Sequence, residues 1–207
     1  MAESANSLRP EEQVQKLQAA YDAYMVALSG TVALGESAIP VLTKALHKKA
    51  NPIALALSYL MELPAAEKAI PGLLECVIPG SWPIFDDAQK ALVRAGSKIL
   101  PYLLARLREG VRQEDDEAVR HLLYVAAELP SDTHEKLVQV IVQLLHHANP
   151  HIREAAVDAI WKLGLPHGRP AESDLLDLAQ NDPEEFVRAA ADEALSRLGA
   201  SAQLTNH

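Results

Sequence analysis

The stretch Asn149-Pro150-His151-Ile152-Arg153-Glu154-Ala155-Ala156 predicts a helix that begins at a defined residue. Asn caps the free amide groups at a helix start, and Pro fits the first turn because its missing N–H would have no partner there. Apolar residues continue at helical spacing to Ile160 and Leu163, and Gly164 is typical of a helix end. We therefore expect a helix over residues 149–164.

The same pattern recurs along the chain. Thirty-five residues further on, Asp182-Pro183 precedes Phe186-Val187-Arg188-Ala189-Ala190-Ala191, and Gly199 follows as a second expected stop. Towards the N-terminus, each matching segment has apolar residues at i, i+3, i+4 and i+7, which is the helical period. These earlier segments are residues 51–64, 83–96 and 115–130.

A second type of helix lies between these segments, and its first three copies carry an Ile/Leu-Pro-x-Leu motif, whereas the fourth lacks the Pro and the fifth is more polar. The motif prolines are Pro40, Pro71 and Pro101, which are 31 and 30 residues apart. A Pro in the first helical turn costs little stability, so these residues mark helix starts. The corresponding segments are residues 38–46, 69–77, 99–107, 137–145 and 171–178.

The two helix types alternate as a pair that repeats about every 30 to 38 residues. Repeated pairs that each bury one face on the next pair form an α-solenoid. The sequence therefore predicts an all-α fold, a right-handed superhelix of about five to six pairs. We expect disordered tails at residues 1–10 and 200–207 around one domain over residues 11–199.

Composition limits the function classes. The 207 residues are 49% hydrophobic but only 4% aromatic, so Leu, Ala, Val and Ile are expected to fill the core. The net charge of −9 argues against nucleic-acid and anionic-membrane partners, which need a basic surface. The N-terminus lacks an apolar signal segment and Cys76 has no second cysteine to pair with, so a cytoplasmic protein is expected.

Residues 149–164 resemble the HEAT repeat, in particular the short bacterial type known from phycobilisome lyases, and residues 182–199 match it as well. The resemblance spans residues 36–199. It implies that the first helix of each pair lies on the convex side and the second helix on the concave side. It also implies that Arg153 and Arg188 form hydrogen bonds between neighbouring repeats, confined to the C-terminal half because the earlier repeats lack this Arg.

No catalytic motif points to an enzyme or a cofactor, because phosphate loops, nucleotide-binding Gly motifs and His-Glu-x-x-His are all absent. Two clusters raise the question of a metal. His146, His147 and His151 could be zinc ligands but also suit a helix end. The acidic run Glu114-Asp115-Asp116-Glu117 could bind a hard cation but also suits a helix start, which we favour.

Three further features have a structural and a functional interpretation. The only basic stretch, residues 90–112, is interpreted as solvated helix faces, with an acidic partner's docking patch as the alternative. Trp82, in a turn-rich link, is a candidate interface hot spot, whereas Trp161 is expected to pack on the next repeat. Cys76 is expected to be a buried, inert thiol.

The leading functional hypothesis is a non-enzymatic scaffold or adaptor that binds a protein partner on the concave face. One alternative is a pigment-lyase-like or chaperone-like subunit, suggested by the repeat subtype. Another is DNA-lesion binding, as in HEAT-like glycosylases, which the acidic charge disfavours.

The expected binding face comes from aligning the second helices. Tyr102 is placed at its centre because Tyr is a favoured interface anchor. The other aligned surface residues surround it in rows along the face. These residues are Val41, Lys44, Lys48, Glu75, Val140, Gln143 and His147.

Overall fold

The structure is a computed structural model, and it describes residues 10–46, 51–78, 84–130, 133–164 and 167–204. The regular elements in these ranges are helices, and no β-strand occurs among them. The α-helices are α1 (Pro10–Ala33), α2 (Ile39–Ala45), α3 (Asn51–Leu60), α4 (Ile70–Cys76), α5 (Phe85–Arg94), α6 (Leu100–Arg112), α7 (Asp116–Ala127), α8 (His134–Leu144), α9 (Pro150–Leu163), α10 (Glu172–Asn181) and α11 (Glu185–Leu204). Short 3-10 turns precede α2, α4, α6 and α10, as η1 (Gly35–Ser37), η3 (Pro64–Ala69), η4 (Gly96–Ile99) and η6 (Arg169–Ala171).

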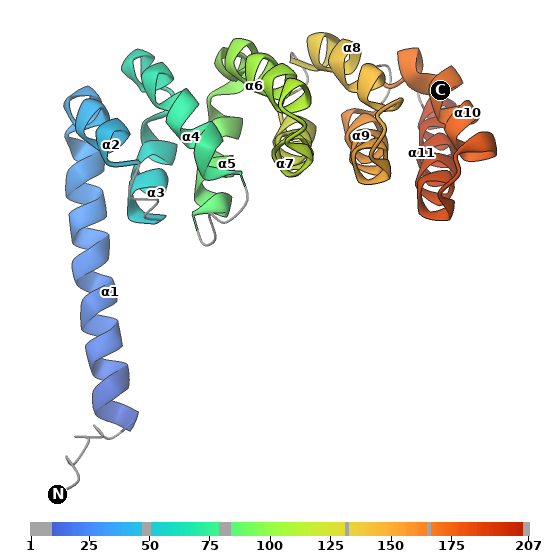
Figure 1. Cartoon of the computed structure of the whole chain (residues 1–207). Helices are drawn as coiled ribbons and strands as arrows, with labels where there is room; N and C mark the ends of the chain where they lie inside the picture. Colours follow the sequence, from blue (N-terminus) through green and yellow to red (C-terminus); the bar gives the residue numbers. More distant parts are fainter. Residues whose placement is uncertain (1–9, 47–50, 79–83, 131–132, 165–166, 205–207) are drawn as a thin grey trace, which may run out of the picture.

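The helices form two layers in an open, elongated stack (Figure 1). The even-numbered layer consists of α2, α4, α6, α8 and α10, and the odd-numbered layer consists of α3, α5, α7, α9 and α11. Each even-numbered helix packs on the odd-numbered helix that follows it, and each odd-numbered helix also packs on the next one in its own layer. The all-α prediction is confirmed, whereas the number and hand of the repeats remain predictions.

Local sequence accounts for the helix starts. Pro40, Pro71 and Pro101 lie in the first turns of α2, α4 and α6, as the Ile/Leu-Pro motif predicts. The Asn149 side chain caps α9 by accepting a hydrogen bond from the amide of His151 at 2.9 Å. Asp115 caps α7 in the same manner, so the expected helix-start role of the acidic run is confirmed for Asp115.

Helix ends follow the expected glycine rule in part. Gly96 and Gly164 end α5 and α9 with φ values of +58° and +63°, a conformation that glycine adopts without a steric penalty. The prediction that Gly199 is a stop is wrong, because α11 continues through it to Leu204. Gly199 does not have a positive φ, and without the left-handed residue of a glycine cap the helix simply continues.

The core lies between the two layers and is filled by aliphatic side chains. Leu57, Leu73, Leu92, Leu103 and Leu122 are among its fully buried members. No aromatic side chain in the described residues is fully buried, which agrees with the low aromatic content of the chain. Cys76 is buried, and Trp161 packs against the core with the Arg197 guanidinium 4.4 Å from its ring centre, so the structural interpretation of both is confirmed.

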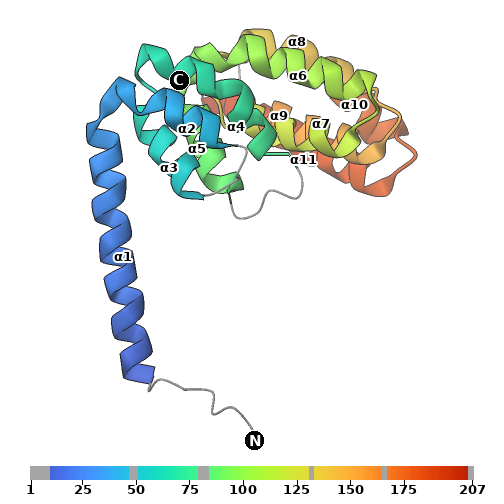
Figure 2. The ribbon, with the colours of Figure 1, turned by 60° about the vertical axis from the view of Figure 1, so that its left-hand side comes forward.

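Helix α1 differs from the others because most of it projects away from the stack (Figures 1 and 2). Its C-terminal part packs on α3, and Leu28 is only 8% exposed, but Leu17 is 73% exposed. No single helix in the described residues is long and apolar enough to cross a membrane. Among the described residues, only the segments Glu11–Ala33 and Gly35–Ala45 taken together have the required length and hydropathy, and they are bent by 103° relative to each other.

Candidate functional site, a groove between α6 and α8

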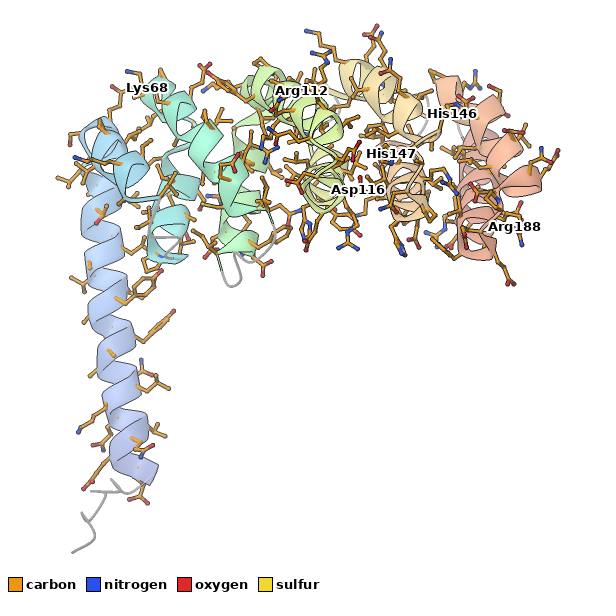
Figure 3. The ribbon with its side chains drawn as sticks, in the orientation of Figure 1. Lys68, Arg112, Asp116, His146, His147 and Arg188 are labelled. Carbon is orange, nitrogen blue, oxygen red and sulfur yellow. The ribbon has the colours of Figure 1, made fainter. Side chains whose placement is uncertain are left out.

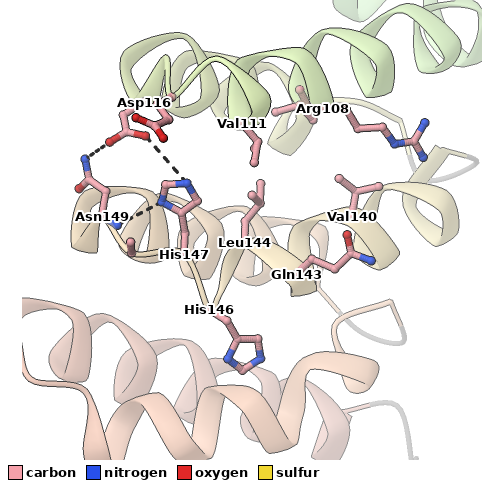
Figure 4. Close-up of a pocket in the computed structure, with 12 residues that line it drawn as sticks. Arg108, Val111, Asp116, Val140, Gln143, Leu144, His146, His147 and Asn149 are labelled. Carbon is pink, nitrogen blue, oxygen red and sulfur yellow. Dashed lines mark hydrogen bonds and ion pairs between the residues drawn. The ribbon is translucent and has the colours of Figure 1, made fainter.

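A groove of about 760 Å³ lies in the even-numbered layer (Figure 4). Helix α6 forms one wall with Arg108 and Val111, and helix α8 forms the other with Val140 and Leu144. The turns that lead into α7 and α9 close one end. A hollow of this size lies within the usual range for ligand-binding pockets.

A network of polar contacts builds the closed end of the groove. The backbone N–H of Asn149 donates to Nδ1 of His147 at 3.1 Å, which leaves Nε2 of His147 directed at Oδ1 of Asp116, 3.9 Å away. The side-chain amide of Asn149 donates to the other Asp116 oxygen at 2.6 Å. Figure 3 shows Asp116 and His147 lying between the two repeats. The network therefore joins the starts of α7 and α9 and fixes the turn that carries His147.

Arg153 supports the same turn from the other side. Its Nη1 donates to the carbonyl oxygens of His147 and Ala148 at 2.9 and 3.0 Å. Its Nε and Nη2 donate to both carboxylate oxygens of Asp182, at 2.7 and 2.8 Å, from the repeat that follows. This charged hydrogen bonding holds the pKa of Asp182 below its usual value and raises the pKa of Arg153. The bridging role expected of Arg153 is confirmed.

Arg188, the equivalent residue of the last repeat, donates to the carbonyl oxygens of Asp182 and Pro183 at 2.6 and 3.1 Å. These bonds repeat the two carbonyl contacts of Arg153, but they lie within the turn that precedes α11, so the expectation that Arg188 connects neighbouring repeats is wrong. In the N-terminal half, other cations connect repeats: Arg94 donates to the carbonyl of Ser58 at 3.0 Å, and Lys98 donates to that of Glu62 at 3.5 Å.

A smaller hollow of about 280 Å³ lies on the other side of α6, between α4 and α6. Its lining includes Tyr102 and Glu75. Tyr102 is half-buried and donates a hydrogen bond to Glu67 at 3.2 Å, which raises the pKa of its phenol. Glu75 accepts a hydrogen bond from Nε of Arg106 at 2.9 Å. Tyr102 remains partly accessible, as an anchor for a partner requires.

The structure groups the expected surface residues into separate places. Val140, Gln143 and His147 line the groove, whereas Glu75 and Tyr102 line the smaller hollow. Val41 and Lys44 lie exposed on α2, outside the linings of both hollows, and Val41 is 70% exposed. Lys48 and Trp82 lie outside the described residues, so their expected roles remain predictions. The residues expected to form one binding face therefore lie in two hollows on opposite sides of α6, and on α2.

The basic stretch over residues 90–112 is divided between α5 in one layer and α6 in the other. Arg94 stacks on Tyr59 with 5.2 Å between the guanidinium carbon and the ring centre, and Lys90 lies 3.5 Å from Asp87. On α6, Arg106 binds Glu75 and Arg112 binds Glu109. Within this stretch, Arg108 alone forms no hydrogen bond or ion pair with the described residues.

The three clustered histidines have different partners. His146 lies 3.3 Å from Asp174, His147 contacts Asp116, and His151 lies 3.6 Å from Glu154 and stacks on Phe186. In the described part of the chain, no group of three or more His, Cys, Asp or Glu residues is arranged to hold a metal ion. His147 also accepts a hydrogen bond from the backbone N–H of Asn149 at 3.1 Å.

Sequence reasoning missed Arg108, Val111 and Leu144, which complete the groove. Val111 follows Leu107 by four residues and continues the apolar face of α6, so the spacing favoured burial, whereas its side chain is 38% exposed near the end of the helix. Arg108 gave no signal of its own, since the spacing could not show which arginines would be bound by Glu75 and Glu109.

Repeated helix pairs in two layers, with contacts between successive pairs, define an all-α repeat protein. Residues 100–196 match the family model of HEAT repeats. Residues 100–196 therefore carry HEAT-like repeats, and this matched part contains the groove and the Arg153–Asp182 pair. A search of curated proteins gives no match.

Proposed function

We propose that the chain is a non-enzymatic scaffold or adaptor, a right-handed α-solenoid that binds a protein partner on its even-numbered layer. HEAT repeats commonly mediate protein–protein interaction, which supports the general class. One observation carries the choice of surface: the groove between α6 and α8 combines exposed apolar side chains with polar groups that have no partner within the described residues.

The apolar and polar parts of the groove both favour a protein ligand. Val111 is 38% exposed on the α6 wall and Val140 is half-buried on the α8 wall, so an apolar side chain of a partner that fills the groove would remove apolar surface of both from water. Arg108 and the Gln143 amide make no side-chain hydrogen bonds within the described residues. Partly exposed apolar groups edged by available hydrogen-bonding groups are typical of protein interfaces.

The proposal is tested by photo-cross-linking in the cells that produce the protein. A photoreactive amino acid replaces Gln143 in the groove or, as the matched control, Asp192 on the outer part of α11; both positions are exposed. We expect a discrete cross-linked protein from position 143 that is absent from position 192. Equal cross-linking from both positions, or none from position 143, would contradict the proposal.

A further inference from the structure

The groove has opposite charges at its two ends and an apolar floor between them (Figure 4). Leu107 and Leu144 are buried beneath it, and Val111 and Val140 reach its surface. A ligand that fits this groove must therefore present one apolar side chain with a different charge on either side of it.

Arg108 provides the cationic end. It is exposed, whereas the other two arginines of α6, Arg106 and Arg112, are bound by Glu75 and Glu109. A guanidinium group binds a carboxylate through two parallel hydrogen bonds, which makes this end selective for an acidic side chain.

Glu114 provides the anionic end. Its exposed side chain has no partner in the described residues, and the nearby Asp116 is held by Asn149 and faces His147. His146, the other titratable group at this end, is paired with Asp174. A carboxylate in this position favours a cationic side chain from the partner.

The spacing of the two ends indicates the conformation of the ligand. From Arg108 to Arg112, where α6 ends, the helix rises by about 6 Å, and Glu114 lies beyond that end. An extended peptide rises about 3.3 Å per residue and directs every second side chain to the same face. Residues i, i+2 and i+4 of an extended segment cover about 13 Å and match the three parts of the groove.

We propose that this groove binds an extended peptide segment of the partner with the pattern acidic–x–apolar–x–basic, in either chain direction. The carboxylate pairs with Arg108, the apolar side chain covers Val111 and Val140, and the cation pairs with Glu114. The amide of Gln143 lies beside the bound segment and is available to its backbone. This inference rests on the proposed function and specifies the chemistry that the partner must carry.

Synthetic peptides test the pattern directly. The probes are fluorescein-labelled Gly-Glu-Ser-Leu-Ser-Lys-Gly and its reversed sequence, and binding to the full chain is measured by fluorescence polarisation. We expect at least one of the two to bind, and replacement of its Leu by Ser to weaken binding at least about fivefold, since the apolar contact is lost. Failure of both probes to bind at millimolar concentration would overturn the inference.

Charge exchange supplies the decisive control. Arg108→Glu should weaken binding at least about fivefold, and a peptide with Lys in place of Glu should restore it. Glu114→Lys should likewise be rescued by Glu in place of the peptide's Lys. Arg112→Glu changes the same charge on α6 outside the groove and should leave the affinity within about twofold. Equal loss for Arg108→Glu and Arg112→Glu, without rescue, would overturn the inference.

The two proposals can fail separately. A partner that cross-links at position 143 while no probe peptide binds would leave the scaffold function standing and reject the acidic–x–apolar–x–basic pattern. Peptide binding with rescue, but without any cross-linked protein, would support the chemistry of the groove and count against the proposed scaffold function.

Discussion

Asp182 is a buried carboxylate in the C-terminal half that joins two successive repeats. Its side chain is 2% exposed, and it accepts two hydrogen bonds from the nearly buried Arg153 and one from the amide of Glu184. A buried carboxylate without these donors would be costly, so removing one member of such a pair costs about 3–5 kcal/mol. Arg153 also holds the turn of His147, which connects this pair to the groove.

The pH dependence of the free energy of unfolding reports how much the Arg153–Asp182 pair stabilises the fold. The pKa of Asp182 is lowered in the folded state, mainly by the hydrogen bond from Arg153, so its stabilising contribution is complete above the ordinary value of 3.8. The contribution is lost as the pH falls through the lower, folded-state pKa. We expect Asp182→Asn to unfold more easily than the wild type at pH 7, with the difference narrowing between about pH 5 and pH 2.

Denaturant titrations over this pH range provide the measurement. The matched control is Asp177→Asn, an exposed carboxylate on α10 that hydrogen-bonds to Asn181. Its pH profile should run parallel to that of the wild type. A constant difference between Asp182→Asn and the wild type at all pH values would show that the Asp182 carboxylate does not stabilise the fold through its charge.

The residues of this pair illustrate what sequence could and could not predict. Arg153 stood out because it repeats at Arg188, and its bridging role followed from the family resemblance. The contact of Asp116 with His147 could not be predicted from the sequence. An acidic residue at this position is equally expected at the start of a helix, so its presence does not indicate a contact with the next repeat. Arg106 pairs with Glu75 because α4 packs on α6, which no spacing in the sequence reveals, whereas Glu109 and Arg112 are three residues apart on α6, a spacing that indicates their pairing.

Among the elements, the end of α6 departs from the rule that the other helix ends follow. Glu114 occupies the left-handed position after the helix with φ of +57°, where Gly96 and Gly164 are found at other ends. The amides of Glu114 and Asp115 donate to the carbonyls of Val111 and Gly110 at 3.2 and 2.9 Å, the hydrogen-bond pattern of a glycine-type cap. A non-glycine residue in this conformation costs about 1–2 kcal/mol.

Glu114→Gly is therefore expected to raise the free energy of unfolding by about 0.5–1 kcal/mol, after the greater freedom of glycine in the unfolded chain is subtracted. The reverse change, Gly96→Ala, should lower it by about 1 kcal/mol. A Cβ at Gly96 would meet no atom within 4 Å, so that loss comes from the backbone alone. Denaturant melts measure both changes, and a loss of stability in Glu114→Gly would contradict the assigned strain.

The helices themselves were predictable from sequence because caps, prolines and apolar period agree at most positions. Helix α1 was the exception: residues 11–34 gave the least regular pattern, and most of this helix packs on nothing among the described residues. The sequence of this segment predicts that it is helical. How much of the helix is covered depends on its packing against α3, which the sequence pattern does not show.

At the scale of the whole molecule, stability depends on contacts between successive helix pairs. Leu103 in α6 is fully buried between the layers, whereas Leu176 in α10 is 46% exposed. We expect Leu103→Ala to lower the free energy of unfolding by about 2–5 kcal/mol, the usual cost of a cavity at a buried Leu. Leu176→Ala should change it by no more than about 0.5 kcal/mol. Denaturant melts measure both free energies of unfolding. A loss below about 1 kcal/mol for Leu103→Ala would show that Leu103 is not part of the core.

The contacts between repeats also determine how the protein can fold during synthesis. Arg153 and Asp182 are 29 residues apart in the chain, and Arg94 and Ser58 are 36 apart. A repeat leaving the ribosome therefore waits for roughly one further repeat before its contacts form, and no segment waits for the far terminus. Chains with such local contacts fold fast, and domains form in order from the N-terminus as the chain grows. The closed end of the groove is therefore supported by the Arg153–Asp182 pair only after the repeat that carries Asp182 has been synthesised.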